Sequence, residues 1–273
     1  MAKLKIGVLV ILENGAKKEL KKVHEFGLQS CQLSCWDPSC YTDAIADEVI
    51  GSCRKYGIEI STLWAGLPGT NTWNFTEGPP TIGLVPPETR EMRIHALEQA
   101  SNFAKTIGVD AVTTHVGFIP EWPGDYLYQD TVEALKHISQ YCKSNNQHFC
   151  FETGQETPIT LLRTIQDVGM NNLGINLDPA NLLMYGKANP VDALDIIGEY
   201  VRNVHAKDGE YPVDGRDLGV EKPLGEGRVN FPVLVAKLKS LGYTGPLTIE
   251  REISGEEQIA DIRTAIKILE PLC

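Results

Sequence analysis

The 273-residue sequence lacks features that would assign it to several specialised classes of protein. No stretch approaches the roughly 20 consecutive apolar residues that cross a bilayer, which excludes a membrane-spanning helix. The apolar run in the N-terminal segment MAKLKIGVLVILENG is short and is followed by no small-residue cleavage site. It therefore indicates a first buried strand rather than a signal peptide. We expect a cytoplasmic protein without a membrane partner.

Cysteine pairs at metal-binding or redox spacing are also missing. The seven cysteines form an odd set without any CxxC pair. This argues against a disulfide framework or a zinc knuckle and favours reduced, mostly buried thiols. Cys31, Cys35 and Cys40 are the nearest approach to a cluster, and a metal site there is the less favoured interpretation.

Positive charge is scarce. With 25 Lys and Arg against 36 Asp and Glu, the net charge of −11 would repel a phosphate backbone, because generic nucleic-acid affinity comes from basic side chains that displace counterions. A glycine-rich phosphate loop is absent too, since LGEGRV at 224–229 lacks the strand-glycine-helix context of a nucleotide-binding loop. We expect a neutral or weakly charged small substrate and no nucleic-acid partner.

What the sequence does contain is a regular alternation of short β-rich runs and amphipathic segments. Eight strands are predicted at 5–12, 30–36, 59–66, 111–117, 148–153, 173–178, 201–207 and 246–252. Eight helices are predicted at 16–27, 42–57, 88–107, 126–145, 158–168, 190–200, 231–241 and 255–269. No internal repeat or linker interrupts them. These counts and the length predict an α/β fold, a (β/α)8 TIM barrel formed as a single domain over 1–273.

Two helices carry recognisable boundary signals. Ser254 is the predicted N-cap of the last helix, with Glu257 completing a capping box. Thr157 is the predicted N-cap of the fifth helix, and Gly169 follows its last periodic residue. The last helix also has one apolar stripe, formed by Ile259, Ile262, Ile266 and Leu269.

Four chemically reactive side chains stand at the ends of the last four predicted strands. They are Glu152, Asp178, His205 and Glu250, at the ends of the runs HFCFE, LGINLD, RNVH and PLTIE. Strand side chains alternate, so apolar neighbours that face the helices turn all four into the barrel. Equivalent positions on successive parallel strands would bring the four together at one end of the barrel.

Several carboxylates in a buried interior are costly unless a cation compensates them. Three carboxylates and one imidazole favour Mn²⁺ or Mg²⁺, with Co²⁺, Fe²⁺ or Zn²⁺ also compatible. For any one of these acids alone, a helix cap or a surface ion pair is the commoner role. The four together predict a divalent metal site.

Other residues are candidates for contact with a substrate. The same alternation turns His115 and Lys207 inward, where each could bind a substrate, with core packing or carboxylate neutralisation as the alternatives. Trp36 and Trp64 end the second and third strands and could form an apolar wall against a sugar, although tryptophan more often packs in a core. The long connections 67–87 and 209–230 both follow strands, so they are predicted to form walls or lids of the site.

Several segments resemble the xylose isomerase-like TIM barrel superfamily of sugar isomerases and epimerases. They are FETGQET, INLDPANLLMYG, NVHAKDGE, PLGEGRVNF and LTIERE, so the resemblance is strongest in the second half. The branch most resembled contains ketose 3-epimerases such as D-tagatose 3-epimerase, where a Glu, Asp, His and Glu set holds a divalent ion, often manganese. The resemblance implies that role for Glu152, Asp178, His205 and Glu250.

The same resemblance implies a mechanism. The metal would hold a carbonyl and a neighbouring hydroxyl of a sugar, and an enediolate would form. Glu152 and Glu250 would be the general base and general acid. Proton return to the opposite face gives an epimerase, and proton return to the neighbouring carbon gives an isomerase.

The sequence departs from the 3-epimerase pattern in two places. Asn181 stands where that branch has a histidine three residues after the aspartate, and we expect Asn181 to bind substrate. The stretch ETGQETP replaces a motif that carries an arginine and a second glutamate. Ketohexose specificity therefore does not transfer. In the long seventh connection, Glu226 and Arg228 are candidates for the rim of the site, with simple turn chemistry as the alternative.

Three other functions compete with the sugar isomerase or epimerase. The same enediolate could expel a leaving group, which would give a lyase or dehydratase acting on keto-sugars or 3-keto-glycosides. An endonuclease IV-like phosphodiesterase is a remote alternative, because that type gathers many histidines and this chain has six. A non-enzymatic sugar-binding protein is the third. Apolar loops at barrel mouths often pack against a partner chain, so a homo-oligomer is possible.

Overall fold

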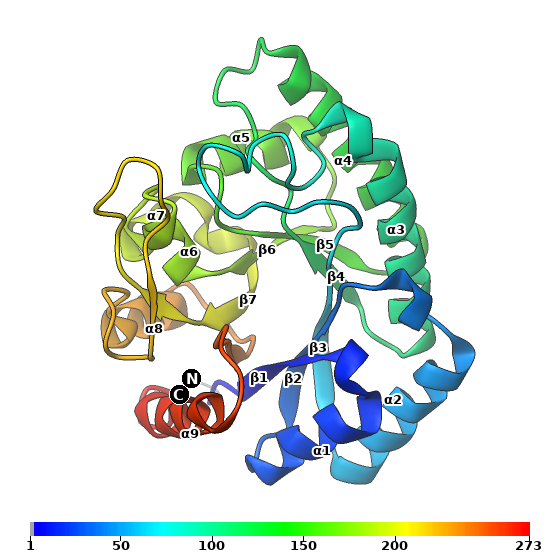
Figure 1. The fold of residues 1–273 in the computed structure, drawn as a ribbon, viewed down its shortest axis with the longest axis vertical. Coiled ribbons are helices and arrows are strands. Elements are labelled where there is room, and N and C mark those ends of the chain that lie inside the picture. The colour runs from blue at the N-terminus through cyan, green and yellow to red at the C-terminus, as the bar shows by residue number, and fades with distance from the viewer. Residues whose placement is uncertain (1–2) are drawn as a thin grey trace.

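The computed structural model describes residues 3–273 and forms a closed parallel barrel inside a ring of helices (Figure 1). Within this range the strand order is β1–β10–β7–β6–β5–β4–β3–β2. The strands are β1 (Ile6–Ile11), β2 (Ser30–Cys35), β3 (Glu59–Ala65), β4 (Ala111–Thr114), β5 (His148–Glu152), β6 (Leu173–Leu177), β7 (Val201–Ala206) and β10 (Leu247–Ile249). The predicted (β/α)8 TIM barrel is confirmed. Met1 and Ala2 of the predicted domain lie outside the described residues.

The helices follow the strands in turn, with one addition to the predicted set. They are α1 (Ala16–Glu25), α2 (Asp43–Tyr56), α3 (Pro87–Thr106), α4 (Tyr126–Ser144), α5 (Pro158–Val168), α6 (Pro179–Met184), α7 (Pro190–Ile197), α8 (Phe231–Ser240) and α9 (Glu256–Leu269). Short 3-10 turns cover Leu12–Asn14, Pro38–Cys40 and Gly198–Tyr200. No helix in residues 3–273 is long and apolar enough to cross a membrane.

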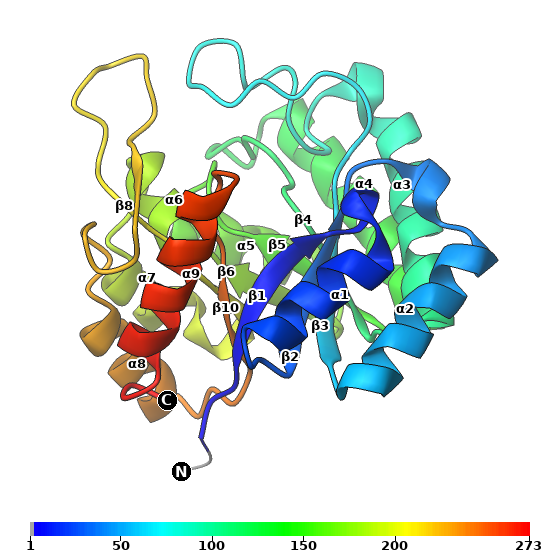
Figure 2. The ribbon, with the colours of Figure 1, turned by 60° about the horizontal axis from the view of Figure 1, so that its bottom comes forward.

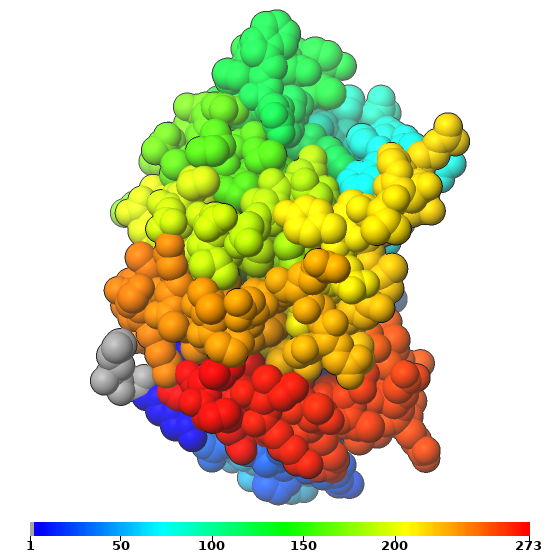
Figure 3. All heavy atoms as spheres, turned by 90° about the vertical axis from the view of Figure 1, so that its left-hand side faces the viewer, coloured from blue at the N-terminus to red at the C-terminus, as the bar shows by residue number. Residues whose placement is uncertain are grey.

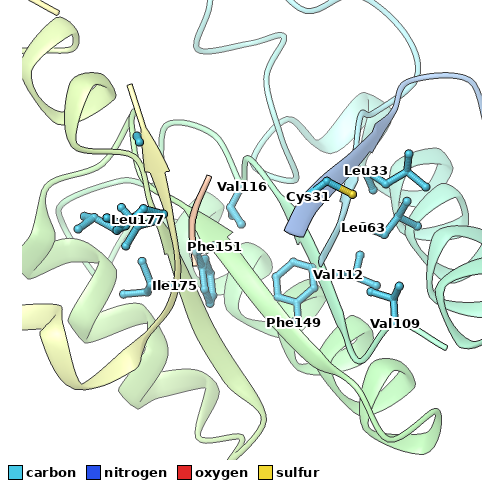
Figure 4. Close-up of a cluster of buried hydrophobic side chains, with 14 of the residues drawn as sticks. Cys31, Leu33, Leu63, Val109, Val112, Val116, Phe149, Phe151, Ile175 and Leu177 are labelled. Carbon is cyan, nitrogen blue, oxygen red and sulfur yellow. The ribbon is translucent and has the colours of Figure 1, made fainter. Parts of the chain in front are cut away.

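The main core lies between the outer face of the barrel and the helices. Figure 4 shows apolar side chains that leave the strands in this direction, among them Val112, Phe149, Phe151, Ile175 and Leu177. All five are at most 1% exposed. Because neighbouring strand residues point to opposite faces, the polar residues between them face the barrel interior, as the alternation predicted.

The predicted caps of α5 are confirmed, and that of α9 is wrong. The Thr157 hydroxyl accepts a hydrogen bond from the Thr160 amide at 3.3 Å, and Gly169 ends α5 with a φ of 67°. The N-cap of α9 is Gly255, not Ser254, and no side chain caps it. Gly255 has a φ of 87°, a backbone geometry that glycine adopts without strain, so the helix begins one residue later than a Ser254 cap requires.

Apart from the 3-10 turns, three short elements were not predicted. Helix α6 begins directly after β6, with Asp178 as its N-cap and Pro179 in its first turn. Strands β8 (Asp208–Gly209) and β9 (Glu221–Lys222) pair antiparallel and close the base of the long seventh connection. Figure 3 shows this connection, in yellow, projecting from the surface. A proline after an aspartate is a recognised helix start, so α6 had a readable signal.

Strand β4 is shorter than predicted because a loop takes over its pairing. The Val116 carbonyl accepts a hydrogen bond from the Leu84 amide at 2.8 Å, which draws the chain after Thr114 out of the ladder. Gly83 and Gly117 both have positive φ and pack so closely that a side chain on either would overlap the opposite backbone. The connection after β3 is therefore held against the end of β4.

The buried guanidinium of Arg93, on α3, anchors the same connection. It donates to the carbonyls of Pro68 at 3.1 Å, Thr70 at 3.0 Å, Thr81 at 2.7 Å and Gly83 at 2.8 Å. Burial lowers the pKa of Arg93. Figure 2 shows the two long connections, cyan and yellow, rising at the same end of the barrel. Both connections lie at the end of the barrel where the site is predicted.

Candidate metal centre and cavity

The structure brings Glu152, Asp178, His205 and Glu250 together inside the barrel. One ligand atom from each lies within 4.8 Å of all the others. The Nδ1 atom of His205 is 2.8 Å from Glu250 Oε2, 3.2 Å from Glu152 Oε1 and 3.6 Å from Asp178 Oδ2. Three of the four side chains are at most 2% exposed, and that of Glu250 is 12% exposed. Within residues 3–273 this is the one such group of His, Cys, Asp and Glu side chains.

Each of the four is placed by the end of a strand. Glu152 is the last residue of β5, and Asp178 follows β6 as the N-cap of α6, where its Oδ1 accepts from the Asn181 amide at 2.8 Å. His205 lies in β7, in register with Thr248 of β10. Glu250 follows β10 directly. The parallel ladder therefore sets all four at the carboxyl end of neighbouring strands.

These residues have the properties of a cation site. Asp178 Oδ2, His205 Nδ1 and Glu250 Oε2 are buried and lack a hydrogen bond of good geometry. Buried polar atoms without partners are rare in folded proteins, and three of them that face one another need a shared partner. A divalent ion held by three carboxylates and one imidazole would meet that need. The residue set fits a metal.

Without a metal, the same charges act on His205. Burial alone lowers the pKa of this imidazole, but the carboxylates of Glu250 and Glu152 outweigh burial and raise the pKa well above its usual value. A bound cation would compete with that proton, because only the neutral imidazole binds a metal.

An amide side chain that sequence reasoning missed holds the other nitrogen of His205. The Nε2 of His205 is 2.8 Å from Gln32 Oε1, and Gln32 Nε2 donates to Asn176 Oδ1 at 2.8 Å. Gln32, on β2, is fully buried. When Nε2 carries the proton and donates it to Gln32, Nδ1 has a free lone pair that faces the carboxylates. An inward-facing glutamine in the strand SCQLSC was the only signal for this role.

Lys207 contributes the one ammonium at the centre within the described residues. Its Nζ lies 2.5 Å from Glu252 Oε1, 3.5 Å from Asp178 Oδ2 and 3.7 Å from Glu250 Oε2. It also donates to Asn181 Oδ1 at 3.4 Å. Burial alone would lower the pKa of Lys207, but Glu250 and Glu252 raise it well above its usual value. Lys207 is therefore a permanent cation that offsets part of the negative charge.

A cavity of about 530 Å³ opens above these groups. Four predicted substrate residues line it, namely Trp36, Trp64, His115 and Asn181. Lys207 faces the same centre through Asn181 and Glu250. Trp73 lines it too and comes from the connection 67–87, which was predicted to form a wall or lid of the site. Sequence reasoning missed Tyr185, which also lines the cavity.

Three tryptophans form one wall of this cavity, named here the tryptophan wall: Trp36, Trp64 and Trp73. The ring centroids of Trp36 and Trp64 are 5.0 Å apart, and those of Trp36 and Trp73 are 6.3 Å apart. The indole of Trp64 donates a hydrogen bond to Glu152 Oε2, which links the wall to the metal centre. Gly66 lies against the Trp36 ring, where any side chain would overlap it.

Two predicted rim residues, Glu226 and Arg228, do not reach the cavity. Both are exposed and neither lines it. The Asp208 carboxylate accepts hydrogen bonds from the amides of Gly225, Gly227 and Val229 at 2.9, 3.1 and 3.0 Å. These bonds fold the segment back on β8 and leave both side chains outside. Asp208 therefore has a structural role.

The connection after β5 buries two polar side chains that sequence reasoning left unassigned. Gln155 and Glu156 are 1% and 3% exposed, and none of their side-chain N and O atoms has a hydrogen-bond partner in the described structure. Burial raises the pKa of Glu156 to about 8. Near neutral pH this acid is therefore largely protonated and adds little negative charge beside the metal centre.

The cysteines take no part in the centre. All seven are free thiols, and Cys31 and Cys35 are fully buried. In the part of the chain that is described, no metal-binding group includes Cys31, Cys35 or Cys40. Burial raises the pKa of Cys142 and of Cys150 to about 12, so these thiols stay protonated.

Solved structures share this architecture over the whole chain. A xylose isomerase domain protein from Planctomyces limnophilus is 34% identical, with a TM-score of 0.94 over 99% of this chain and 98% of that one. A D-tagatose 3-epimerase-like protein is 20% identical, with a TM-score of 0.75 over 98% and 97% of the two chains. A xylose isomerase-like TIM barrel protein from Mycobacterium smegmatis, in complex with magnesium, is 17% identical, with a TM-score of 0.72 over 99% and 98%.

The family assignment follows from a match along almost the entire chain. The model of the xylose isomerase-like TIM barrel family matches residues 20–272, a range that contains β2 to β10 and all four residues of the candidate metal centre. The chain belongs to the xylose isomerase-like TIM barrel family.

Proposed function

We propose that this protein is a divalent-metal-dependent epimerase or isomerase of a sugar or sugar derivative. The observation that carries the proposal is the group of three buried ligand atoms without a well-formed hydrogen bond, on Asp178, His205 and Glu250, below a cavity of about 530 Å³. The likeness to a D-tagatose 3-epimerase-like protein supports the same reaction class.

Glu152, Asp178, His205 and Glu250 would hold the metal, for which we propose Mn²⁺. When bound, such an ion supplies Lewis acidity, which polarises a sugar carbonyl and makes the neighbouring C–H more acidic. Magnesium suits the carboxylates as well, and the M. smegmatis protein of this fold binds it. The imidazole ligand disfavours magnesium, which prefers oxygen ligands, and the three carboxylates favour manganese among the transition metals.

The two glutamates are proposed to move the proton. They stand three strands apart in the order β10–β7–β6–β5, so they approach a substrate from different sides. Glu152 is held by the indole of Trp64 and, at 3.4 Å, by the amide of Asn181. Glu250 Oε2 has no such partner. One carboxylate would remove a proton from carbon, and the other would return one.

The surrounding residues would bind and orient the substrate. Lys207, held by Glu252, would assist substrate binding through its positive charge, which offsets the carboxylates of Asp178 and Glu250 that it faces at 3.5 and 3.7 Å. The tryptophan wall would pack on the C–H face of a sugar and exclude water. His115 lies 3.6 Å from Glu152 Oε1, between Trp64 and Trp73, where it would donate to a sugar hydroxyl.

The decisive experiment is isotope exchange in D₂O with a panel of ketoses and 3-keto-glycosides. Protein purified without chelator is assayed for metal content and then incubated with each sugar and Mn²⁺. Deuterium incorporation at carbon without loss of an aglycone supports epimerisation or isomerisation, and release of an aglycone assigns the lyase alternative. Metal-loaded protein that exchanges no proton on any sugar would overturn the proposal.

Phosphodiester cleavage is not supported as a function. The metal group of the described chain contains one histidine, and His24, His95 and His137 lie on the outer helices α1, α3 and α4. A site with several metals and many histidines is not formed by these residues.

A further inference from the structure

The cavity extends beyond the metal centre, over the end of β1, into a crevice between α1 and α9. Figure 2 shows these two helices, blue and red, on either side of β1. The residues of this part, named here the α1–α9 crevice, are Glu19, Lys22, Ser254, Gln258 and Ile262. They belong to the same continuous cavity as Glu152 and Glu250.

Polar contacts give the α1–α9 crevice both donors and acceptors. Lys22 Nζ donates to Gln258 Oε1 at 3.2 Å, and Gln258 Nε2 donates to the Arg251 carbonyl at 2.9 Å. Glu19 is 4% exposed and its Oε2 lies 3.4 Å from the Ile11 amide. Ile262 adds an apolar surface. Mixed donors, acceptors and a methyl-rich patch suit a molecule with hydroxyls on its edges and C–H groups on its faces.

The charges around the cavity disfavour a phosphate. Arg251 is already bound by Glu221 at 2.6 Å and Asp261 at 2.8 Å. Lys207 is bound by Glu252 at 2.5 Å. Phosphate sites need basic groups that are free to form charge-assisted hydrogen bonds.

Only Lys22 lacks a carboxylate within 4 Å, among the cavity-lining Lys and Arg side chains that the structure describes. Its neighbours in the crevice include the buried Glu19, and the first turn of α9 carries Glu256 and Glu257. These acids would repel an anion bound at Lys22. The carboxylates of Glu256 and Glu257 also offset the partial positive charge at the N-terminus of α9.

The size of the cavity points to a ligand larger than one sugar ring. Cavities of about 300–1,000 Å³ hold drug-sized molecules, and this one has about 530 Å³. The tryptophan wall and the metal centre occupy one end, which leaves the α1–α9 crevice for a second unit.

We propose that the substrate is an uncharged glycoside, in which a keto-sugar unit sits at the metal centre and a second neutral sugar unit sits in the α1–α9 crevice beside Lys22 and Gln258. The inference rests on the proposed function and narrows its substrate class. It distinguishes this protein from enzymes that act on sugar phosphates.

Matched ligands test the proposal by titration calorimetry on the Mn²⁺-loaded protein. The probes are D-fructose, its 1- and 6-phosphates, and the two disaccharides that carry a glucosyl group at those same positions, trehalulose and isomaltulose. We expect at least one disaccharide to bind about tenfold more tightly than D-fructose, and neither phosphate to gain affinity. Equal affinity of D-fructose and both disaccharides, or tighter binding of a phosphate, would overturn the inference.

Variants then test whether the α1–α9 crevice is the source of the tighter binding of disaccharides. Lys22→Ala and Gln258→Ala should each bring the ratio of disaccharide to D-fructose affinity close to one. Lys21→Ala is the matched control, because Lys21 is exposed on α1 and pairs with Glu25 at 2.6 Å. A ratio that survives both crevice variants contradicts the assignment. If no probe binds to metal-loaded protein, the proposed function fails first and the inference falls with it.

Discussion

The two halves of the barrel differ in chemistry although they share one backbone plan. Strands β5, β6, β7 and β10 place ionisable groups at their carboxyl ends, namely Glu152, Asp178, His205 and Glu250. Strand β2 leads instead into Trp36, β3 contains Trp64, and β2 contributes the neutral amide of Gln32. One half is built to hold charge and the other to hold an uncharged surface. Four predictions test this division, from the largest expected effect to the smallest.

The charged half should be indispensable for turnover. Glu152→Gln removes one ligand charge and one proton acceptor, and we expect kcat to fall by about 10²–10⁴-fold. Steady-state kinetics with a sugar identified by isotope exchange measures the loss of activity. Metal analysis of the variant shows how much of this loss comes from reduced metal content. The control is Glu133→Gln, an exposed glutamate on α4 that pairs with Lys136 at 2.7 Å. If kcat of Glu152→Gln stays within a factor of three of wild type, the charged half is not indispensable for turnover.

The charged half should tolerate buried negative charge only next to a cation. Glu156 is buried without a partner, and burial raises its pKa to about 8 from a usual 4.5. The folded state therefore keeps a proton that the unfolded state has lost, so the stability from this group is full below pH 4.5 and is lost as pH rises through about 8.

Urea unfolding of metal-free protein at acidic and alkaline pH measures this loss. Relative to Glu156→Gln, the wild type should lose about 4 kcal/mol more between pH 5 and pH 9. The exposed Glu133→Gln serves again as control. Parallel pH profiles of wild type and Glu156→Gln would show that the Glu156 carboxyl is not neutral in the folded state.

The neutral half should support the charged half through Gln32. In Gln32→Leu, His205 Nε2 loses its acceptor and the tautomer that presents Nδ1 is no longer favoured, so we expect metal affinity to fall about 10–100-fold. Calorimetry with Mn²⁺ measures the affinity, and nitrogen NMR of the His205 ring reports the tautomer.

A conservative variant separates positioning from packing. Gln32→Glu keeps an acceptor for His205 Nε2–H, and Asn176 can turn its unpartnered Nδ2 towards the new carboxylate. Metal affinity should therefore return close to that of wild type. If Gln32→Glu binds metal as poorly as Gln32→Leu, the role of Gln32 is one of packing.

The tryptophan wall should affect substrate binding and leave the metal unaffected. Trp36→Ala removes a half-exposed ring from the cavity, and we expect KM to rise about 3–10-fold with little change in kcat or Mn²⁺ affinity. Trp122→Ala is the control, because Trp122 is 71% exposed and lies outside the cavity lining. If the two variants change KM equally, the tryptophan wall has no specific role in substrate binding.

The sequence predicted the charged half better than the neutral half, for a physical reason. Strand alternation fixes which side chains face inward, so the positions of Glu152, Asp178, His205 and Glu250 followed from period-two patterns. The partnership between Gln32 and His205 joins residues 173 positions apart across the barrel, and no local pattern encodes it.

Loop residues were predicted least well. Trp73 reaches the cavity because its connection is held by Arg93 and by the contact between Gly83 and Val116, neither of which is visible in local sequence. Glu226 and Arg228 failed to reach the cavity because Asp208 holds their backbone elsewhere. The cap of α9 was wrong by one residue for a similar reason, since the backbone angles of Gly255 decide where the helix begins.

The backbone course of the connection after β3 depends little on which side chains the connection carries. Arg93 binds mainly backbone carbonyls of this connection, which every amino acid possesses. Substitutions at Trp73 can therefore change what the tryptophan wall recognises while the scaffold keeps the same course. This connection is a natural place to select new sugar preferences in the laboratory, provided that the arginine on α3 is retained.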